Sequence, residues 1–227
     1  MERIMWAEGR QFTNEEKSRN KAYQEGFYIF GGVDSRGQTL NDLWLVKPIY
    51  TANSKQISPS TYEYVEPDSE NIKLSLKMVK MKSSSGQPPC PRINASMAHV
   101  GLKSSGHQLL VVYGGRNDRI FDSTGNVALN DVCIYNCNLE TWEPLAMFGQ
   151  LPCSRWSHSM LALNGSQSAY EGVIIFGGVN LKSYCKSKFY QFTLGSKKDS
   201  KKVQNNVASS KSLRAPESEA VSASSRG

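Results

Sequence analysis

The chain has 227 residues, of which 39% are hydrophobic and 10% aromatic, which is enough for one large or two small packed domains. Its apolar residues come in short runs such as 27–30, 109–113 and 173–176, all far below the roughly 18 that a membrane-spanning helix needs. The N-terminal residues mix acids and bases where a secretory signal would carry an uninterrupted apolar core. We therefore expect a cytoplasmic or nuclear protein, neither secreted nor inserted in a membrane.

The net charge of +7 lies mostly at the C-terminal end. Residues 196–227 hold seven Lys/Arg against three Asp/Glu, which leaves only +3 for the other 195 residues. This segment is rich in Ser and Lys and poor in apolar residues, so it cannot form a core and is predicted to be a disordered tail. Because its positive charges are not interleaved with aromatic residues, nucleic acid is not an expected partner.

The sequence shows no pattern of metal or cofactor ligands. Five cysteines without an export signal predict free thiols in a reducing compartment. Cys133 and Cys137 lie in an extended-looking run, where four residues separate them by roughly 13 Å, too far for one ion. The three histidines lack HExxH or HxH spacing. We expect no metal, no cofactor and no catalytic residue.

Residues 1–25 carry the least readable pattern. Their charge alternation favours an exposed short helix or loop over strands. Trp6 could instead belong to the end of a repeat unit that precedes the first clear one.

Three short apolar runs each end in a pair of glycines. Residues 27–30, 109–113 and 173–176 precede Gly31-Gly32, Gly114-Gly115 and Gly177-Gly178. Runs of β-forming residues without alternation predict strands that are covered on both faces, as in a sheet stacked between other sheets. The glycines end each strand where a side chain would clash or where φ must be positive.

A polar loop and a second strand follow each glycine pair. Residues 40–46, with Asn41-Asp42, match residues 129–135, with Asn130-Asp131, and more loosely residues 187–192. Short polar side chains suit a turn into a strand. After this strand the first unit carries an insertion, 47–71, which is rich in Ser, Thr and Pro. It is predicted to be an exposed loop or hairpin, and a role of its own is the less favoured interpretation.

A Gly-Gln-x-Pro-Cys-x-Arg turn occurs twice, at 86–92 and 149–155. The two copies are 63 residues apart, and the same offset relates residues before and after them, including Met97 to Met160. Four short strands with turn signals therefore form a reused unit, and the predicted fold class is all-β.

These motifs resemble Kelch repeats. The family's unit has an apolar strand ending in Gly-Gly, a polar loop, a second strand with a Tyr-type residue, a Trp about six residues later, and a Gly-x-x-Pro-x-x-Arg connection. Residues 109–155 follow this order almost without gaps. The resemblance implies a β-propeller over residues 26–195, in which each repeat is a four-stranded blade around a central channel.

The chain also departs from the family's pattern. Val79 stands where the other copy has Trp142, Ala95 where it has His158, and Ser187-Lys188 where it has Asn-Asp. About three blades are recognisable, whereas a closed propeller needs at least four. We expect an open arc, a truncated product, or a ring completed by another chain. An uncovered blade face predicts self-association or a tight partner.

The resemblance further implies that one face of loops binds a protein or peptide. In this chain that face is formed by 33–39, 116–128 and 179–186 together with 83–91 and 146–154. The candidate partner-binding residues are Arg36, Arg92, Arg116, Asn117, Asp118, Arg119, Phe121 and Arg155. Arginines beside an exposed-looking Phe favour an acidic partner, bound by carboxylate contacts and an apolar anchor.

Three of the residues in this region have competing interpretations. The recurrence of Arg92 and Arg155 within the turn favours a structural role, bonding loop carbonyls, over partner binding. His158 lies between Ser157 and Ser159, which could form a Ser/His nucleophile pair. Neighbouring strand residues point to opposite faces and no GxSxG motif is present, so a packed histidine is favoured.

The expected function is that of a non-catalytic protein–protein interaction scaffold. One alternative is the substrate-recognition fragment of a ubiquitin-ligase adaptor, although no BTB-like or F-box-like region is recognisable in the 25 residues before the first repeat. Another is an enzyme, since some Kelch-like propellers are copper oxidases. That activity needs clustered His and Tyr ligands, which the sequence does not show.

Overall fold

The computed structural model describes residues 2–8, 24–52, 55–57, 72–103, 105–121, 123, 125–143, 146–148, 152–163, 171–181 and 189–195. Every regular element within these ranges is a β-strand, which confirms the all-β prediction. The predicted disordered tail, 196–227, lies outside them.

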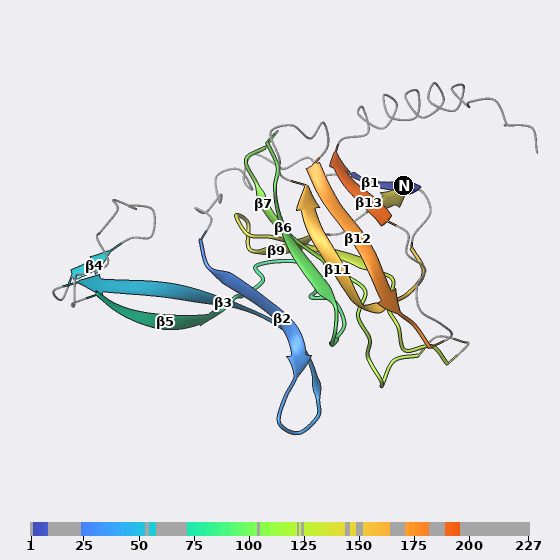
Figure 1. The fold of residues 1–227 in the computed structure, drawn as a ribbon, viewed down its shortest axis with the longest axis horizontal. Helices are drawn as coiled ribbons and strands as arrows, with labels where there is room; N and C mark the ends of the chain where they lie inside the picture. Colours follow the sequence, from blue (N-terminus) through green and yellow to red (C-terminus); the bar gives the residue numbers. More distant parts are fainter. Residues whose placement is uncertain are drawn as a thin grey trace, which may run out of the picture.

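The strands form three sheets (Figure 1). The first sheet contains β2 (Phe27–Val33), β3 (Thr39–Ala52), β4 (Lys55–Ile57) and β5 (Ile72–Lys80). The middle sheet contains β6 (Ser96–Gly101), β7 (Gln108–Tyr113), β8 (Val132–Asn136) and β9 (Thr141–Glu143). The third sheet contains β11 (Trp156–Leu163), β12 (Glu171–Val179), β13 (Phe189–Gly195), β1 (Glu2–Glu8) and β10 (Ala146–Phe148).

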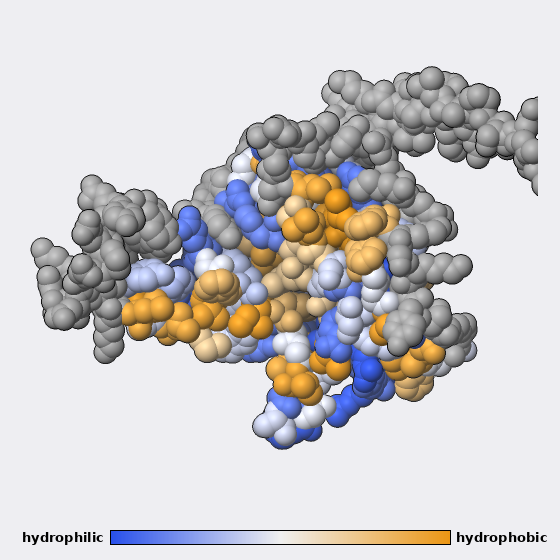
Figure 2. Space-filling view, in the orientation of Figure 1, coloured by the Kyte–Doolittle hydropathy of each residue, from blue (hydrophilic) through white to orange (hydrophobic). Residues whose placement is uncertain are grey.

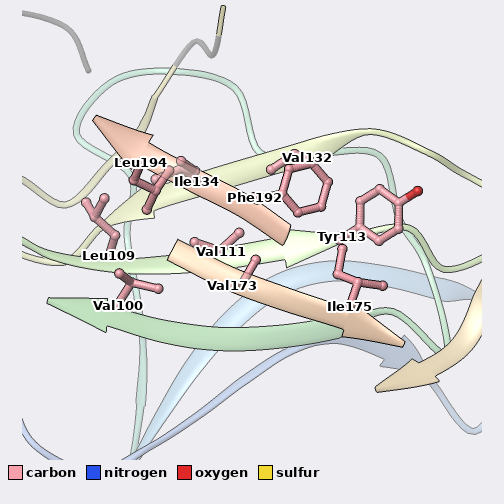
Figure 3. Packing of buried hydrophobic residues seen from close by; sticks show 10 residues of the cluster. All are labelled: Val100, Leu109, Val111, Tyr113, Val132, Ile134, Val173, Ile175, Phe192 and Leu194. Carbon is pink, nitrogen blue, oxygen red and sulfur yellow. The ribbon is translucent and has the colours of Figure 1, made fainter. Parts of the chain in front are cut away.

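The middle sheet is buried between the other two. Leu110, Val112, Tyr135 and Trp142 pack with Leu43 of the first sheet. The opposite face of the middle sheet packs on the third sheet, through a cluster that Figure 3 shows: Val100, Leu109, Val111, Tyr113, Val132, Ile134, Val173, Ile175, Phe192 and Leu194. The described residues thus form three stacked sheets that are consistent with blades of a partial propeller.

Of the three apolar runs that precede glycine pairs, only the one in the middle sheet is buried on both faces of its strand. All five residues from Leu109 to Tyr113 are buried, because alternate side chains enter the two cores. Phe27 in the first sheet and Phe176 in the third are exposed instead. The prediction that these strands are covered on both faces is therefore confirmed for β7. It is wrong for β2 and β12, because their sheets are covered on only one face within the described chain.

The glycine pairs adopt the positive φ values that the sequence predicted, as in Gly31 at 68° and Gly114 at 61°. They also permit a close approach. A Cβ on Gly31 would lie 2.6 Å from the carbonyl oxygen of Arg92, and one on Gly114 would lie 2.6 Å from that of Arg155. The first two pairs therefore each receive the connection that leads into the following sheet.

The strand register identifies the residue that replaces the repeat's tryptophan. Trp142 pairs with Tyr135 in the middle sheet, and in the first sheet the residue equivalent to Tyr135, Val46, pairs with Met78. Val79 pairs with Leu45 and lies on the other face. Met78 thus occupies the tryptophan position, although sequence spacing alone pointed to Val79.

The insertion at 47–71 begins as a continuation of the first sheet. β3 runs on to Ala52. It pairs with β5 along the whole length of β5, from Trp44 opposite Lys80 to Ala52 opposite Ile72. This part of the first sheet forms an arm that projects from the three-sheet stack (Figure 1). Of the two predicted forms, the described part is a hairpin, while residues 53–54 and 58–71 lie outside the described residues.

Residues 2–8 form a strand, where the sequence favoured a helix or loop. β1 pairs in parallel with β13 and antiparallel with β10, so the first described strand of the chain joins the sheet that contains the last one. No local pattern could show this, because the partner strand lies at the other end of the sequence. The rest of the 1–25 prediction falls on residue 1 and residues 9–23, outside the described residues, and on residues 24–25, which are not in a strand.

Candidate partner-binding rim

Arg92 joins the first sheet to the middle sheet. Its amide donates to the Leu40 carbonyl at 3.0 Å, and its own carbonyl accepts from the Gly32 amide at 2.9 Å. Its guanidinium donates to the Gly114 carbonyl at 3.0 Å and makes two 2.7 Å bonds to the carboxylate of Asp131. The backbone of this residue thus belongs to one sheet and its side chain to the next.

Arg155 repeats this arrangement between the middle and third sheets. Its amide donates to the Leu129 carbonyl, and its carbonyl accepts from the Gly115 amide. Its guanidinium donates to the Gly177 carbonyl at 2.7 Å and lies 4.8 Å from the ring centre of Tyr190. Both arginines are at most 1% exposed. They have the structural role that the repeat favoured, and burial leaves them no surface to present to a partner.

The pair of Arg92 and Asp131 is stabilised by mutual electrostatics. Burial opposes the charge on each, but the hydrogen bonds and opposite charge of the partner prevail. They raise the pKa of Arg92 and hold the pKa of Asp131 below its usual value. The Asp131 side chain keeps 45% exposure, so solvent screens part of this attraction.

The exposed candidates lie on two loops, of which the first is the β2–β3 turn. Asp34 accepts hydrogen bonds from the amides of Arg36 at 2.9 Å and Gln38 at 2.8 Å. The Arg36 Nε lies 3.3 Å from the Asp34 carboxylate, with the Arg36 side chain 79% exposed. Arg36 is thus on the surface, with an acidic neighbour beside it.

The second loop, 116–127, is anchored at its base to both inter-sheet connections. Asn117 is 3% exposed and donates to the Pro91 carbonyl at 2.6 Å, on the connection from the first sheet. Asn126 donates to the hydroxyl of Ser154 at 2.7 Å, on the connection to the third sheet. Asn117 therefore positions the loop, and its side chain is buried.

Arg116 lies at the base of the loop, where its amide donates to the Ile93 carbonyl at 2.9 Å, and it is half-buried. Its guanidinium pairs with Asp118 at 2.8 Å and lies 5.4 Å from the ring centre of Trp156. Beyond Asn117 the described tip of the loop is exposed. Arg119 and Ile120 are exposed, and the Phe121 side chain has 66% exposure. The tip thus combines an apolar surface with charged groups.

The two loops lie on the same side of the stack, because Gly32 at the end of β2 and Asn117 in the second loop both bond the connection at Pro91 and Arg92. Hydrogen bonds, the largest from the Gln38 amide, lower the pKa of Asp34, and the positive charge of Arg119 contributes to the same shift. We call Asp34, Arg36, Arg116, Asp118, Arg119, Ile120 and Phe121 the rim.

The structure divides the eight candidate residues into two groups. Arg36, Arg116, Asp118, Arg119 and Phe121 belong to the rim, whereas Arg92, Asn117 and Arg155 support it from below. Asp34 and Ile120 were not singled out by the repeat pattern, although an Asp two residues before an Arg in a turn is a recognisable signal. The predicted loop 146–154 is wrong at its start, because residues 146–148 form strand β10, which pairs with β1. Residues 149–151 and 182–186 of the predicted loops lie outside the described residues.

His158 is packed in the core between the middle and third sheets. It is 6% exposed, and its ring lies edge-on to Tyr113 with centroids 5.1 Å apart. Its neighbours Ser157 and Ser159 are exposed. Burial, and then the charge of Arg155, lower the pKa of His158 to about 4. The ring is therefore neutral near pH 7 and faces away from both serines.

Within the described ranges, no group of three or more His, Cys, Asp or Glu side chains is placed to hold a metal ion. The described cysteines, Cys90, Cys133, Cys137 and Cys153, carry free thiols. Burial raises the pKa of Cys133 and of Cys137 to about 12, so both thiols stay protonated. In the same part of the chain no helix is long and apolar enough to cross a membrane.

Comparison with known proteins gives a distant similarity. No protein-family model matches the chain. It is 25% identical over 159 residues to Host cell factor 1 of human and of rat, which covers 67% of this chain and 6% of those proteins. The N-terminal region of Host cell factor 1 is a Kelch-repeat propeller, in keeping with the stacked sheets described above. The chain thus corresponds to only a small part of the length of these relatives.

Proposed function

We propose that the chain is a non-catalytic interaction module of the Kelch type, and that the rim binds an acidic protein segment. The observation that carries this proposal is the anchoring of the described part of the second loop, residues 116–121, 123 and 125–127. Its base is fixed by Asn117 and Asn126, while Arg119 and Phe121 at its tip are exposed. A preorganised loop loses little conformational freedom on binding, which favours affinity.

The charges of the rim favour one class of partner. Arg36 and Arg116 each have an aspartate beside them, so Arg119 supplies the positive charge left over among the described rim residues. A carboxylate of the partner would bond Arg119, and an apolar side chain next to it would cover Ile120 and Phe121. The preferred ligand is therefore a short segment with an acidic residue beside an apolar one.

The test is a selection of random peptides displayed on phage against the immobilised chain. We expect the selected peptides to be enriched in Asp and Glu next to an aromatic or aliphatic residue. Arg119→Glu should weaken binding of a selected peptide about ten- to hundredfold, because a charge-assisted hydrogen bond is replaced by repulsion. Phe121→Ser should weaken it by about tenfold through loss of apolar contact.

The matched control is Lys77→Glu, which changes the net charge equally at an exposed position of β5, on the arm. It should leave affinity within about twofold, since a lone surface charge remote from the site contributes little. Selected peptides without acidic residues would refute the proposal. So would a Lys77→Glu variant that binds as weakly as Arg119→Glu, because the effect would then be one of overall charge.

A further inference from the structure

Among the described residues, each end of the three-sheet stack has an exposed apolar face. On the first sheet, Phe27 is 68%, Ile29 49% and Met78 61% exposed. On the third sheet, Leu161 is 69%, Phe176 39% and Phe189 48% exposed. Figure 2 shows the apolar surface of the first sheet extending along the arm of β3 and β5, where Leu74 and Leu76 lie. Apolar areas of this kind on a soluble protein mark interaction surfaces.

The open face of the first sheet repeats a face that the middle sheet buries. Counting from the glycine pairs, Phe27 and Ile29 correspond to Leu110 and Val112. Counting from the Asn-Asp pairs, Val46 corresponds to Tyr135. Leu110, Val112 and Tyr135 pack against the first sheet. The open face of the first sheet is thus built to receive a preceding sheet.

The open face of the third sheet repeats the opposite face of the middle sheet. At the constant offset of 63 residues, Leu161, Ile174 and Phe176 correspond to Ala98, Val111 and Tyr113. The latter three pack against the third sheet. The open face of the third sheet is therefore built to pack on a following sheet, and the two ends are complementary.

At both junctions the aromatic residue before the glycine pair contacts an aromatic ring of the following sheet. Phe30 of the first sheet lies 5.3 Å from Trp142 of the middle sheet, and Tyr113 of the middle sheet lies 5.4 Å from Phe192 of the third, between ring centres. Phe30, Tyr113 and Phe176 occupy the same position, directly before the glycine pair. Phe176 stacks on Phe189 of its own sheet at 4.6 Å and has no following sheet within the described chain.

The first sheet offers a place for this third aromatic ring. Asp42, Asp131 and Lys188 hold the same position in the three units. Four residues after it lie Val46, Tyr135 and Phe192 respectively, so these three residues are equivalent. Met78, which pairs with Val46, holds the position of Trp142. Phe176 would thus pack against Val46 and Met78, as Tyr113 and Phe30 pack against their partners.

We propose that a second copy of this chain covers both faces. The third sheet of one copy packs on the first sheet of the other, and the reciprocal contact is made at the same time. Both new junctions continue the stacking already present between neighbouring sheets of one chain. Two copies of three sheets form a two-fold ring of six, within the range of about four to eight blades that propellers have. This inference does not depend on the function of the rim.

The test uses light scattering or sedimentation equilibrium on the full chain and two charge variants. We expect the wild-type chain to have twice its mass of 25.2 kDa. Met78→Glu and Phe176→Lys should each be monomeric, because a charge is buried at both junctions of the ring. An equimolar mixture of the two should recover the dimer, since one junction is then wild type and the other pairs Glu with Lys.

Two controls separate the proposed ring from other effects. Leu181→Lys adds a charge at an apolar residue that is 59% exposed and lies beyond the end of β12, so it should remain dimeric. Circular dichroism should match the wild type for all variants. If Met78→Glu or Phe176→Lys misfolds, Phe27→Glu and Leu161→Lys replace them as the charge pair.

Three results would overturn the ring. A wild-type monomer would mean that no second copy covers the faces. A Phe176→Lys variant that stays dimeric would indicate contact between two first sheets. Assemblies larger than the dimer would mean that the head-to-tail contact does not close.

Discussion

At the scale of single residues, His158 couples stability to pH. Burial holds its pKa at about 4, below the value of about 6.5 that it has when unfolded. A histidine with a lowered folded pKa stabilises the fold above the unfolded pKa, and this stabilisation is lost as pH falls from 6.5 towards 4. The reason is that the unfolded chain takes up the proton first.

We expect the free energy of unfolding of the wild-type chain to fall between pH 7.5 and pH 5, with His158 contributing about 2 kcal/mol. This pH range lies above the usual pKa of carboxylates, so carboxylates stay charged throughout it. Urea unfolding of the wild type and of His158→Phe at both pH values measures the difference. A variant that loses as much stability as the wild type would show that His158 is not the group responsible.

The bonds between Arg92 and Asp131 lead to a second prediction at this scale. Asp131→Asn should lower the free energy of unfolding by about 2 kcal/mol, a value reduced from that of a fully buried pair because the Asp131 side chain is partly exposed. Chemical denaturation at pH 7 measures it. In the wild type the same contribution should be lost below pH 3.8, as Asp131 becomes protonated.

Asp34→Asn is the matched control, since Asp34 also pairs with an arginine, but with one whose side chain is 79% exposed instead of buried. It should leave the midpoint of denaturation unchanged. Equal effects of the two substitutions would contradict the distinction between an arginine that links sheets and one on the rim.

The sequence predicted the role of some of these residues and not of others. The recurrence of Arg92 and Arg155 in one turn indicated a structural function, because a binding residue need not recur. Asn117 follows no such repeat, and its burial depends on where Pro91 lies in the neighbouring connection. Contacts between loops of different sheets leave no pattern along the chain.

At the scale of elements, the arm of β3 and β5 extends the first sheet without adding to its core. Leu74 and Leu76 are 56% and 63% exposed, whereas Leu45, nearer the stack, is fully buried. We expect replacement of residues 50–74 by Asn-Gly to change the free energy of unfolding by less than about 1 kcal/mol. The new two-residue turn would close the hairpin at the pair Ile49 and Ser75.

Urea unfolding of the shortened chain tests this expectation. Leu45→Ala, in the packed part of the same strand, should cost about 3 kcal/mol and shows that the assay responds to loss of core. If shortening the arm costs as much as Leu45→Ala, the arm contributes to the fold and the expectation is wrong.

Elements with local signals were predicted well, and those that depend on distant partners were not. Glycine pairs located β2, β7 and β12, and the Asn-Asp turns located β3 and β8. β1 was missed because its strand pairing joins Glu2–Glu8 to Phe189–Gly195, residues separated by most of the sequence. Its mixture of charged and apolar residues, ERIMWAE, carries no alternation that would distinguish an added strand from a loop.

At the scale of the whole molecule, the number of repeats predicted an arc, and three stacked sheets are observed among the described residues. Apolar runs in all three sheets suggested that each is covered on both faces. Only the middle sheet is covered on both faces, because whether a face is covered depends on the neighbouring sheets and not on the strand's own sequence. The same runs in the outer sheets therefore indicate where neighbours are missing from the described chain, and that is the basis of the proposed ring.

Arg92 and Arg155 also affect how cooperatively the chain unfolds. Stacked repeats can unfold one by one when the contacts between them are weak. Here the backbone of each arginine is bonded to the sheet before it and its guanidinium to the sheet after it. One sheet cannot unfold without breaking hydrogen bonds held by its neighbour, so the middle sheet, joined on both sides, should be the last region to exchange its amide protons with solvent.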